Sequence, residues 1–267
     1  MYRTIGLVGA GNMGTSILQG VLKGRIAASG RIWVYDKIAA RAKLFARKTG
    51  AHQASSVGEL FRHSDVILLA MKPQDFQEFA AESRGFLRKD HCLITILAGL
   101  STAGILRAFG KKVPVVRAMP NLGAVVGESM TAICGRDRRS LSYAEKLFSG
   151  CGKVARLSED QLDLATAVSG NGPAYFFHLM ELLEDFAAKQ GLPRKVATEL
   201  AVQTAIGAAL LARGADVSPA VLRQRVTSKK GATEAALKVL KKKKFGRIFR
   251  QALTAAVARC RALRKNA

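Results

Sequence analysis

The sequence predicts an α/β domain built on a doubly wound, mostly parallel sheet, followed by an all-helical domain. Up to about residue 155, strand-length apolar runs alternate with segments of helix length. Beyond that point, strand-like runs give way to long helical periods. Strands that alternate with helices are typical of parallel sheets. We therefore place a first domain at residues 1–155 and a second at residues 156–267.

Seven runs in the first domain have the length of strands. Most are almost continuously apolar, as expected for strands that are covered on both faces. The runs are residues 4–10, 31–36, 65–71, 91–99, 113–119, 129–135 and 152–157.

Helices are expected between the early strands and throughout the second domain. In the first domain they fall at residues 12–24 and 39–49, and between Ser101, a suitable N-cap, and Gly110, a suitable left-handed closing residue. In the second domain, Ser158 and Ser218 are each placed to cap a helix. Long apolar stripes then run through residues 173–189 and 249–260.

The composition favours a folded protein that attracts anions. With 267 residues and 49% hydrophobic content, the chain can bury a sizeable core. The net charge is +24, and residues 226–267 contribute 13 Lys and Arg against one acid. A solvated basic helix face is the ordinary interpretation of such a run. We do not expect nucleic acid as a partner, because Phe245 and Phe249 fit a buried stripe better than a stacking platform.

Other residue classes indicate a cytoplasmic protein without a metal site. The four cysteines form no C-x-x-C pair and are expected to be reduced, and the histidines lack ligand spacing. A strand begins almost at the N-terminus, which leaves no room for a signal peptide. The apolar run at residues 201–212 is too short to span a membrane and carries Gln203.

The stretch GAGNMG follows a predicted strand and opens a predicted helix. Its glycines allow a tight turn, close approach to a pyrophosphate and close packing of helix on strand, while the helix N-terminus offers N–H donors. This context predicts a dinucleotide site. The cofactor-binding residues expected here are Gly9, Gly11, Asn12, Met13 and Gly14.

The next strand ends in Asp36, and this position bears on the choice of cofactor. A carboxylate there accepts a hydrogen bond from a ribose 2′-hydroxyl and repels a 2′-phosphate, which favours NADH. The neighbouring Lys37 and Arg41 are placed to serve that phosphate, which favours NADPH. The residues leave both cofactors open.

Two further strand ends carry polar candidates. Ala70, Lys72 and Pro73 stand where open α/β sheets bind ligands, and Lys72 suits either a phosphate contact or a solvated surface. Asn121 is placed either to orient an amide or to begin a turn. Residues 169–173, SGNGP, open a helix with more glycine than a cap requires, which suggests a backbone that passes close to another group.

Five stretches occur in order over nearly the whole chain, and together they resemble the pyrroline-5-carboxylate reductase family. They are IGLVGAGNMG, LLAMKPQ, VVRAMPN, SGNGPAYFF and VTSKKGATEAALKVL. The resemblance implies a Rossmann domain and a helical domain that forms a homodimer, often within a larger ring. It implies hydride transfer from NADPH or NADH to a cyclic imine, giving L-proline. A related imine or oxo-acid reductase and a non-catalytic dinucleotide-binding paralogue are the alternatives.

The resemblance also places a small carboxylate substrate at the last stretch. Backbone N–H groups of Gly231, Ala232 and Thr233, with the hydroxyls of Ser228 and Thr233, suit one carboxylate at a helix N-terminus. Thr233 is the candidate for hydrogen bonding to the ring nitrogen. Asp216 is either a charge that offsets this nitrogen or an exposed loop acid.

The sequence departs from the family pattern at three places. Lys229 and Lys230 replace the Pro-Gly that precedes Gly231 in the family, Leu122-Gly123 follows Asn121 in place of Thr-Pro, and Asn171 replaces a serine. The two lysines would strengthen the attraction for an anion.

Overall fold

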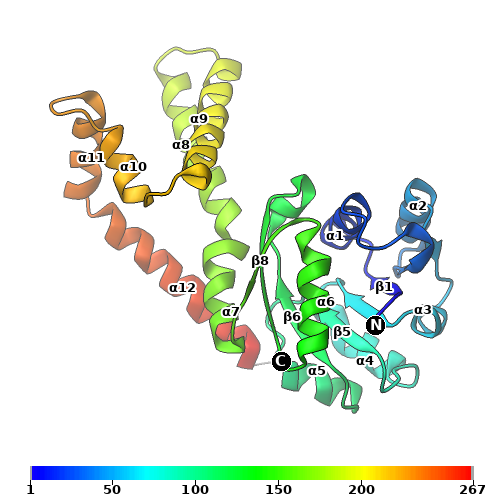
Figure 1. The fold of residues 1–267 in the computed structure, drawn as a ribbon. Coiled ribbons are helices and arrows are strands. Elements are labelled where there is room, and N and C mark those ends of the chain that lie inside the picture. Colours follow the sequence, from blue (N-terminus) through cyan, green and yellow to red (C-terminus); the bar gives the residue numbers. More distant parts are fainter. Residues whose placement is uncertain (1, 266–267) are drawn as a thin grey trace. The chain divides into compact units, whose positions relative to one another are not determined.

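The computed structural model describes residues 2–265, which form two compact units (Figure 1). The first unit comprises the chain up to Asn171 together with the chain from Ala256 onward, and the second is Gly172–Ala255. A boundary at residues 155/156 therefore falls ahead of the point where the two units divide. The reason is packing, because Leu162 lies in a buried cluster with Ala132 and Cys134 of the sheet.

The first unit contains one eight-stranded sheet in the order β3-β2-β1-β4-β5-β6-β7-β8. All neighbouring strands are parallel except β6 and β7. This confirms the predicted doubly wound, mostly parallel sheet. The strands are β1 (Ile5–Val8), β2 (Ile32–Tyr35), β3 (His52–Gln53), β4 (Val66–Leu69), β5 (Cys92–Thr95), β6 (Val115–Met119), β7 (Ser129–Gly135) and β8 (Gly152–Arg156).

The strand order reverses at β1, which has β2 on one side and β4 on the other. Ile5 lies opposite Ile32 on one flank and opposite Val66 on the other. In open α/β sheets, such a reversal leaves a crevice at the carboxyl ends of the strands, where ligands bind.

Helices connect the strands and make up the second unit. Those of the first unit are α1 (Asn12–Lys23), α2 (Ala39–Thr49), α3 (Val57–His63), α4 (Phe76–Ser83), α5 (Thr102–Phe109), α6 (Arg138–Ser149) and α7 (Glu159–Ala165), with short helical turns η1 (Ser29–Arg31), η2 (Pro73–Asp75), η3 (Leu122–Val126) and η4 (Thr166–Gly170). The later helices are α8 (Gly172–Lys189), α9 (Arg194–Gly214), α10 (Pro219–Arg225), α11 (Ala232–Lys242) and α12 (Phe245–Lys265).

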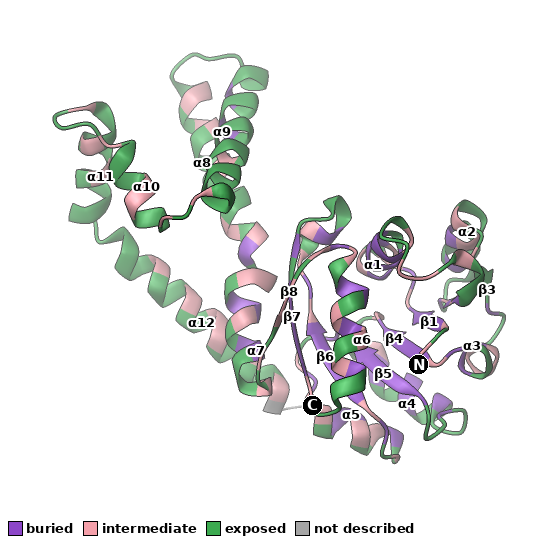
Figure 2. Cartoon of the chain, in the orientation of Figure 1, coloured by how far each residue is buried: buried purple, intermediate pink, exposed green. Residues whose placement is uncertain are grey.

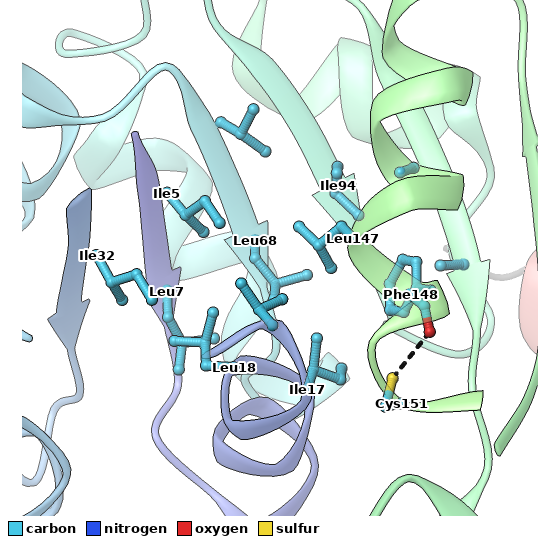
Figure 3. Close-up of a cluster of buried hydrophobic side chains, with 14 of the residues drawn as sticks. Ile5, Leu7, Ile17, Leu18, Ile32, Leu68, Ile94, Leu147, Phe148 and Cys151 are labelled. Atoms are coloured by element: carbon cyan, nitrogen blue, oxygen red, sulfur yellow. Dashed lines mark hydrogen bonds between the residues drawn. The ribbon is translucent and has the colours of Figure 1, made fainter. Parts of the chain in front are cut away.

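The core lies on both faces of the sheet (Figure 2). Ile5 and Leu7 of β1 point into the cluster formed with α1, α2 and α6, whereas Val8 points into the cluster under α3, α4 and α5. Figure 3 shows the first cluster, in which the Cys151 thiol donates to the Phe148 carbonyl at 3.2 Å. Burial on both faces explains why these strands have apolar runs without alternation.

All seven predicted strands are present, and one was missed. β3 has two residues, both exposed, so it carries no apolar signal. The predicted caps are also found, since Ser101 accepts from the Gly104 N–H and Ser158 forms a capping box with Gln161. Ser218 caps α10 by accepting from the Val221 N–H.

The second unit has almost no buried interior of its own. Within its described residues only Gly172, Ala197 and Ala201 are buried, and α8 and α9 expose many large apolar side chains. By length and composition α9 would suffice to cross a membrane, and only 11% of its apolar window is buried within the chain. The expectation that the run at residues 201–212 is too short to span a membrane is therefore wrong for α9, the longer helix that contains it. Composition alone does not separate a membrane helix from one that packs in an oligomer.

An ion pair between a buried arginine and a half-buried glutamate ties α7 to the sheet. Arg117 of β6 is 2% exposed, and its Nη1 donates to Glu159 Oε1 at 2.9 Å. The same carboxylate oxygen accepts from the Thr102 N–H at 2.7 Å. Burial opposes ionisation of Glu159, yet these bonds leave its pKa below the usual value. Arg264 of α12 adds a contact to Asp160 at 3.1 Å.

We predict that Glu159→Gln destabilises the protein by about 2 kcal/mol. The loss stays below the ~3–5 kcal/mol of a fully buried pair because Glu159 is partly exposed and glutamine retains a hydrogen bond. Because the folded-state pKa of Glu159 is lowered, its stabilisation is present above the unfolded pKa of about 4.3 and is lost as the pH falls through the folded value. Chemical denaturation at fixed protein concentration, repeated along a pH series, measures both effects.

Glu145→Gln is the matched control. Glu145 pairs with Arg156 where both side chains are more than 40% exposed, so its removal should change the free energy of unfolding by less than about 0.5 kcal/mol. Equal losses of unfolding free energy in the two variants would show that the burial of Arg117 does not strengthen its ion pair.

Candidate cofactor and substrate sites

The glycine turn after β1 lies at the reversal point of the sheet and contacts the end of β4. Gly9 has a φ of +100°, and a Cβ there would stand 2.6 Å from the Met71 nitrogen and 2.7 Å from the Ala70 carbonyl carbon. The Ala70 N–H donates to the Val8 carbonyl at 2.8 Å. Two of the predicted cofactor stretches are thus side by side.

Gly11 and Gly14 differ in what surrounds them. A Cβ on Gly14 would lie 2.4 Å from the Gly9 carbonyl oxygen, so this glycine allows α1 to pack against the turn. A Cβ on Gly11 would meet nothing within 4 Å. Gly11 is also the N-cap of α1 and provides no side-chain cap. The turn therefore has open space beside Gly11 and uncapped N–H groups at the start of α1, as a bound pyrophosphate requires.

Asp36 fastens this turn from the end of β2. It is 8% exposed, and its Oδ2 accepts from the Ala10 N–H at 2.7 Å while its Oδ1 accepts from the Ile38 N–H at 2.8 Å. The Gly9 N–H also donates to the Tyr35 carbonyl at 2.9 Å. Both carboxylate oxygens thus have a backbone donor, which sequence reasoning did not foresee. Contact between Asp36 and a ribose stays a prediction.

Lys37 is exposed but forms an ion pair. Its Nζ lies 2.8 Å from Oδ1 of Asp75 in η2, which follows β4. This hydrogen bond and charge raise the pKa of Lys37. Lys72 and Pro73, at the start of η2, are both exposed.

Asn121 has protein partners for both polar side-chain atoms. Its Oδ1 accepts from the Gly123 N–H at 3.0 Å, so the residue begins a turn, and its Nδ2 donates to the Ser169 carbonyl at 3.0 Å. Ser169 belongs to η4, a turn of π-helix that ends at Gly170. The stretches VVRAMPN and SGNGP therefore meet within the first unit.

The predicted substrate cradle lies in the second unit at the start of α11. Gly231 is the N-cap, and no side chain caps the helix. The Gly231 N–H donates to the Ser228 carbonyl at 3.1 Å, and contact between this N–H and substrate stays a prediction. The Ser228 hydroxyl fills the space where a Gly231 Cβ would stand, at 2.3 Å. The other predicted members of the cradle are the N–H groups of Ala232 and Thr233 and the exposed hydroxyls of Ser228 and Thr233.

Glu234 and Lys230 shape the rim of this cradle. Lys230 has a φ of +60°, a left-handed conformation that favours the glycine of the family pattern. Its N–H donates to Glu234 Oε2 at 2.9 Å, and this bond, followed by that to Lys238, lowers the pKa of Glu234. Asp216 is exposed in the loop after α9, and no hydrogen bond or ion pair among the described residues joins it to residues 228–233.

Comparison with known proteins gives a consistent result. Residues 159–263 match the family described as pyrroline-5-carboxylate reductase dimerisation, and residues 4–99 match NADP oxidoreductase, coenzyme F420-dependent. Over 259 residues the chain is 36% identical to a pyrroline-5-carboxylate reductase of Pseudomonas aeruginosa, covering 96% of this chain and 94% of the relative. This chain belongs to the pyrroline-5-carboxylate reductase family.

Solved structures of pyrroline-5-carboxylate reductases share the whole fold. The enzyme of Coxiella burnetii is 34% identical, with a TM-score of 0.90 and 98% coverage of both chains. The enzyme of Plasmodium falciparum, solved with NADP bound, is 28% identical, with a TM-score of 0.87 and 98% coverage of both chains. The predicted pairing of a Rossmann-type sheet with a helical dimerisation domain is thus confirmed.

Sequence reasoning missed two features of this reductase, the contact between Lys37 and Asp75 and the role of Arg117. Asp75 approaches Lys37 only through the fold, since 38 positions separate the two. Arg117 was overlooked, although an arginine in an otherwise apolar strand is a sign of a buried ion pair. Among residues 2–265, no group of three or more His, Cys, Asp or Glu side chains is placed to bind a metal ion.

We predict that Gly11→Val abolishes dinucleotide binding without unfolding the protein. The valine side chain would enter the open space beside the turn instead of clashing with the protein. Calorimetric titration with NADH and NADPH measures binding, and thermal melting reports the fold. Undiminished affinity for both dinucleotides would contradict the placement of the pyrophosphate.

Gly14→Val serves as the comparison. Its Cβ would stand 2.4 Å from a backbone oxygen, so this variant should lower the melting temperature as well as the affinity.

Proposed function

We propose that this chain reduces pyrroline-5-carboxylate to L-proline with NAD(P)H, in the cytoplasm. The whole-length relationship to pyrroline-5-carboxylate reductases carries the proposal. The open turn at Gly11 supports a dinucleotide, and the uncapped start of α11 supports a carboxylate. The relative solved with NADP bound supports NADPH as a cofactor. The carboxylate of Asp36 supports NADH as an alternative cofactor.

On the cofactor side, the protein has to bind NAD(P)H and orient it. NAD(P)H supplies the hydride when bound. We assign the pyrophosphate to the first N–H groups of α1, at Asn12, Met13 and Gly14, since an uncapped helix N-terminus favours an anion. Ala70, Lys72 and Pro73 line the adjoining end of β4 and complete the proposed cofactor contacts with Asn121, whose side chain is already engaged within the protein.

On the substrate side, the protein has to hold a carboxylate and an imine. The N–H groups of Ala232 and Thr233 and the Ser228 hydroxyl would bind the carboxylate. The Thr233 hydroxyl would hydrogen-bond to the ring nitrogen. Because a protonated imine is already electrophilic, orientation in a water-poor pocket provides most of the catalysis. Asp216 would offset the charge on the nitrogen.

The second unit also accounts for self-association. Its large exposed apolar side chains on α8 and α9 include Phe176, Phe186 and Leu200, which are 62%, 67% and 52% exposed. The chain's dimerisation family covers both helices. Homo-oligomerisation follows from that family, and we propose that α8 and α9 of a second copy cover this surface, with dimers assembling further into a ring.

We predict that the protein oxidises NADH or NADPH only when pyrroline-5-carboxylate is added, and that Thr233→Ala lowers kcat about 10- to 100-fold. That range corresponds to the loss of one hydrogen bond to a charged reacting group. Cofactor affinity should not change. Steady-state kinetics at matched concentrations of the two cofactors, with calorimetric binding, measure both quantities.

Thr254→Ala is the control for this substitution. Thr254 is an exposed threonine of α12 whose hydroxyl donates to the Arg250 carbonyl, outside the cradle, so kcat should remain at the wild-type value. Full activity in Thr233→Ala would mean that the imine is bound elsewhere. Absence of wild-type activity with either cofactor would overturn the proposed reaction.

We predict that replacing Lys229 and Lys230 together by glutamine raises KM about three- to tenfold and leaves kcat unchanged. Both side chains are exposed beside the cradle, and their charge attracts the anion equally before and during reaction. Glutamine at position 230 keeps the backbone strain, so only the charge changes. Added salt should weaken the wild type more than the double variant.

Lys242→Gln with Lys243→Gln removes the same charge at the far end of α11. The helix has 11 residues, so these lysines lie about 16 Å away, beyond a Debye length of about 8–10 Å. The KM of this double variant should match that of the wild type. An equal rise in KM for both double variants would show that net charge alone is responsible.

A further inference from the structure

The ion pair between Lys37 and Asp75 lies at the cofactor edge of the sheet, and no step of the proposed reaction uses it. Lys37 follows the carboxyl end of β2, and Asp75 follows the carboxyl end of β4. In the sheet β1 lies between these two strands, so the 2.8 Å contact links the segments on either side of the glycine turn.

Lys37 adjoins the position that distinguishes the two cofactors. In this kind of fold, the residue at the end of the second strand meets the adenosine ribose, whose 2′ substituent is a hydroxyl in NADH and a phosphate in NADPH. Asp36 occupies that position with a buried carboxylate, and Lys37 follows directly with a side chain that is 69% exposed. A lysine there is the natural partner of the phosphate.

Asp75 already holds that lysine. Its carboxylate is 31% exposed and accepts a hydrogen bond from Lys37 Nζ, and this bond raises the pKa of the lysine. To bind a 2′-phosphate, the ammonium must leave Asp75 or share the phosphate with it. In either case the phosphate loses part of the attraction of the lysine to Asp75, whereas a 2′-hydroxyl does not depend on that charge.

We infer that Asp75 is a positioning residue for cofactor choice, which lowers the affinity for NADPH by holding Lys37 and leaves the affinity for NADH unaffected. The inference rests on the proposed function, since it requires that the glycine turn binds a dinucleotide. It separates the roles of neighbouring residues, because Asp36 fastens the turn, Lys37 attracts the phosphate and Asp75 moderates that attraction.

The test is a double-mutant cycle with Asp75→Asn, Lys37→Gln and both together. Dissociation constants for NADH and NADPH are measured by fluorescence titration at low ionic strength, without substrate, so the readout does not depend on turnover. In Asp75→Asn the NADPH affinity should rise about three- to fivefold relative to NADH, the size expected for an exposed pair. In the Lys37→Gln background, Asp75→Asn should not change the NADPH affinity relative to NADH. Added salt should shrink the effect.

Asp90→Asn is the matched control. Asp90 pairs with an exposed arginine, Arg88, at 3.1 Å, and it precedes β5, at the opposite edge of the sheet from the cofactor turn. The substitution makes the same chemical change and the same change in net charge. It should leave the ratio of the two dissociation constants at the wild-type value, and thermal melting of every variant checks that the fold is intact.

The outcomes separate the inference from the proposed function. Dinucleotide binding with an unchanged ratio in Asp75→Asn would overturn the inference and leave the reductase assignment standing. An equal gain in NADPH affinity with and without Lys37 would show direct repulsion by Asp75, which also overturns a role through Lys37. A wild-type protein that binds neither dinucleotide would overturn the proposed function and this inference with it.

Discussion

The buried carboxylate of Asp36 is the interaction on which the cofactor edge of the sheet depends. It joins the end of β2 to the turn after β1 by accepting from the Ala10 and Ile38 N–H groups. Hydrogen bonds to a charged group contribute roughly 1.5–3 kcal/mol each, and both are shielded from water here. Since Gly9 lies against the backbone of Ala70, fixing this turn also fixes its contact with the end of β4. The three strand ends are thus connected at one edge.

This constraint limits what Asp36 can do for cofactor choice. A carboxylate has about four acceptor positions, and two of them are used by the backbone. A ribose hydroxyl can use a remaining position, but a change at Asp36 would also release the turn that every dinucleotide needs. Lys37 and Asp75 have exposed side chains, so they can vary without releasing the turn. In the proposed cofactor site, a buried charge would therefore serve affinity and exposed charges would serve selectivity.

The sequence predicted the features that depend on residues close together in the chain. Apolar runs predicted the buried strands, serine caps predicted helix starts, and the glycine spacing predicted a turn at the end of β1. Contacts set by the fold had no such signal. The edge strand β3 has only two exposed residues, and Asn121 reaches the Ser169 carbonyl 48 positions later.

The two proposed anion sites have different charge balances. Both helices start at a glycine without a capping side chain, but α11 places its own carboxylate, Glu234, in its first turn. That carboxylate is offset by Lys238, at 3.2 Å, and by the Lys230 N–H. No ion pair within the described residues involves the side chains of Lys229 or Lys230.

Their charges are therefore available to the substrate carboxylate proposed at this helix start, where Glu234 already places a negative group. Holding Lys230 in a left-handed conformation costs about 1–2 kcal/mol, which glycine at this position would avoid. Because the N–H that Lys230 donates to Glu234 would be present in glycine as well, the side-chain charge is what lysine adds in return for this strain.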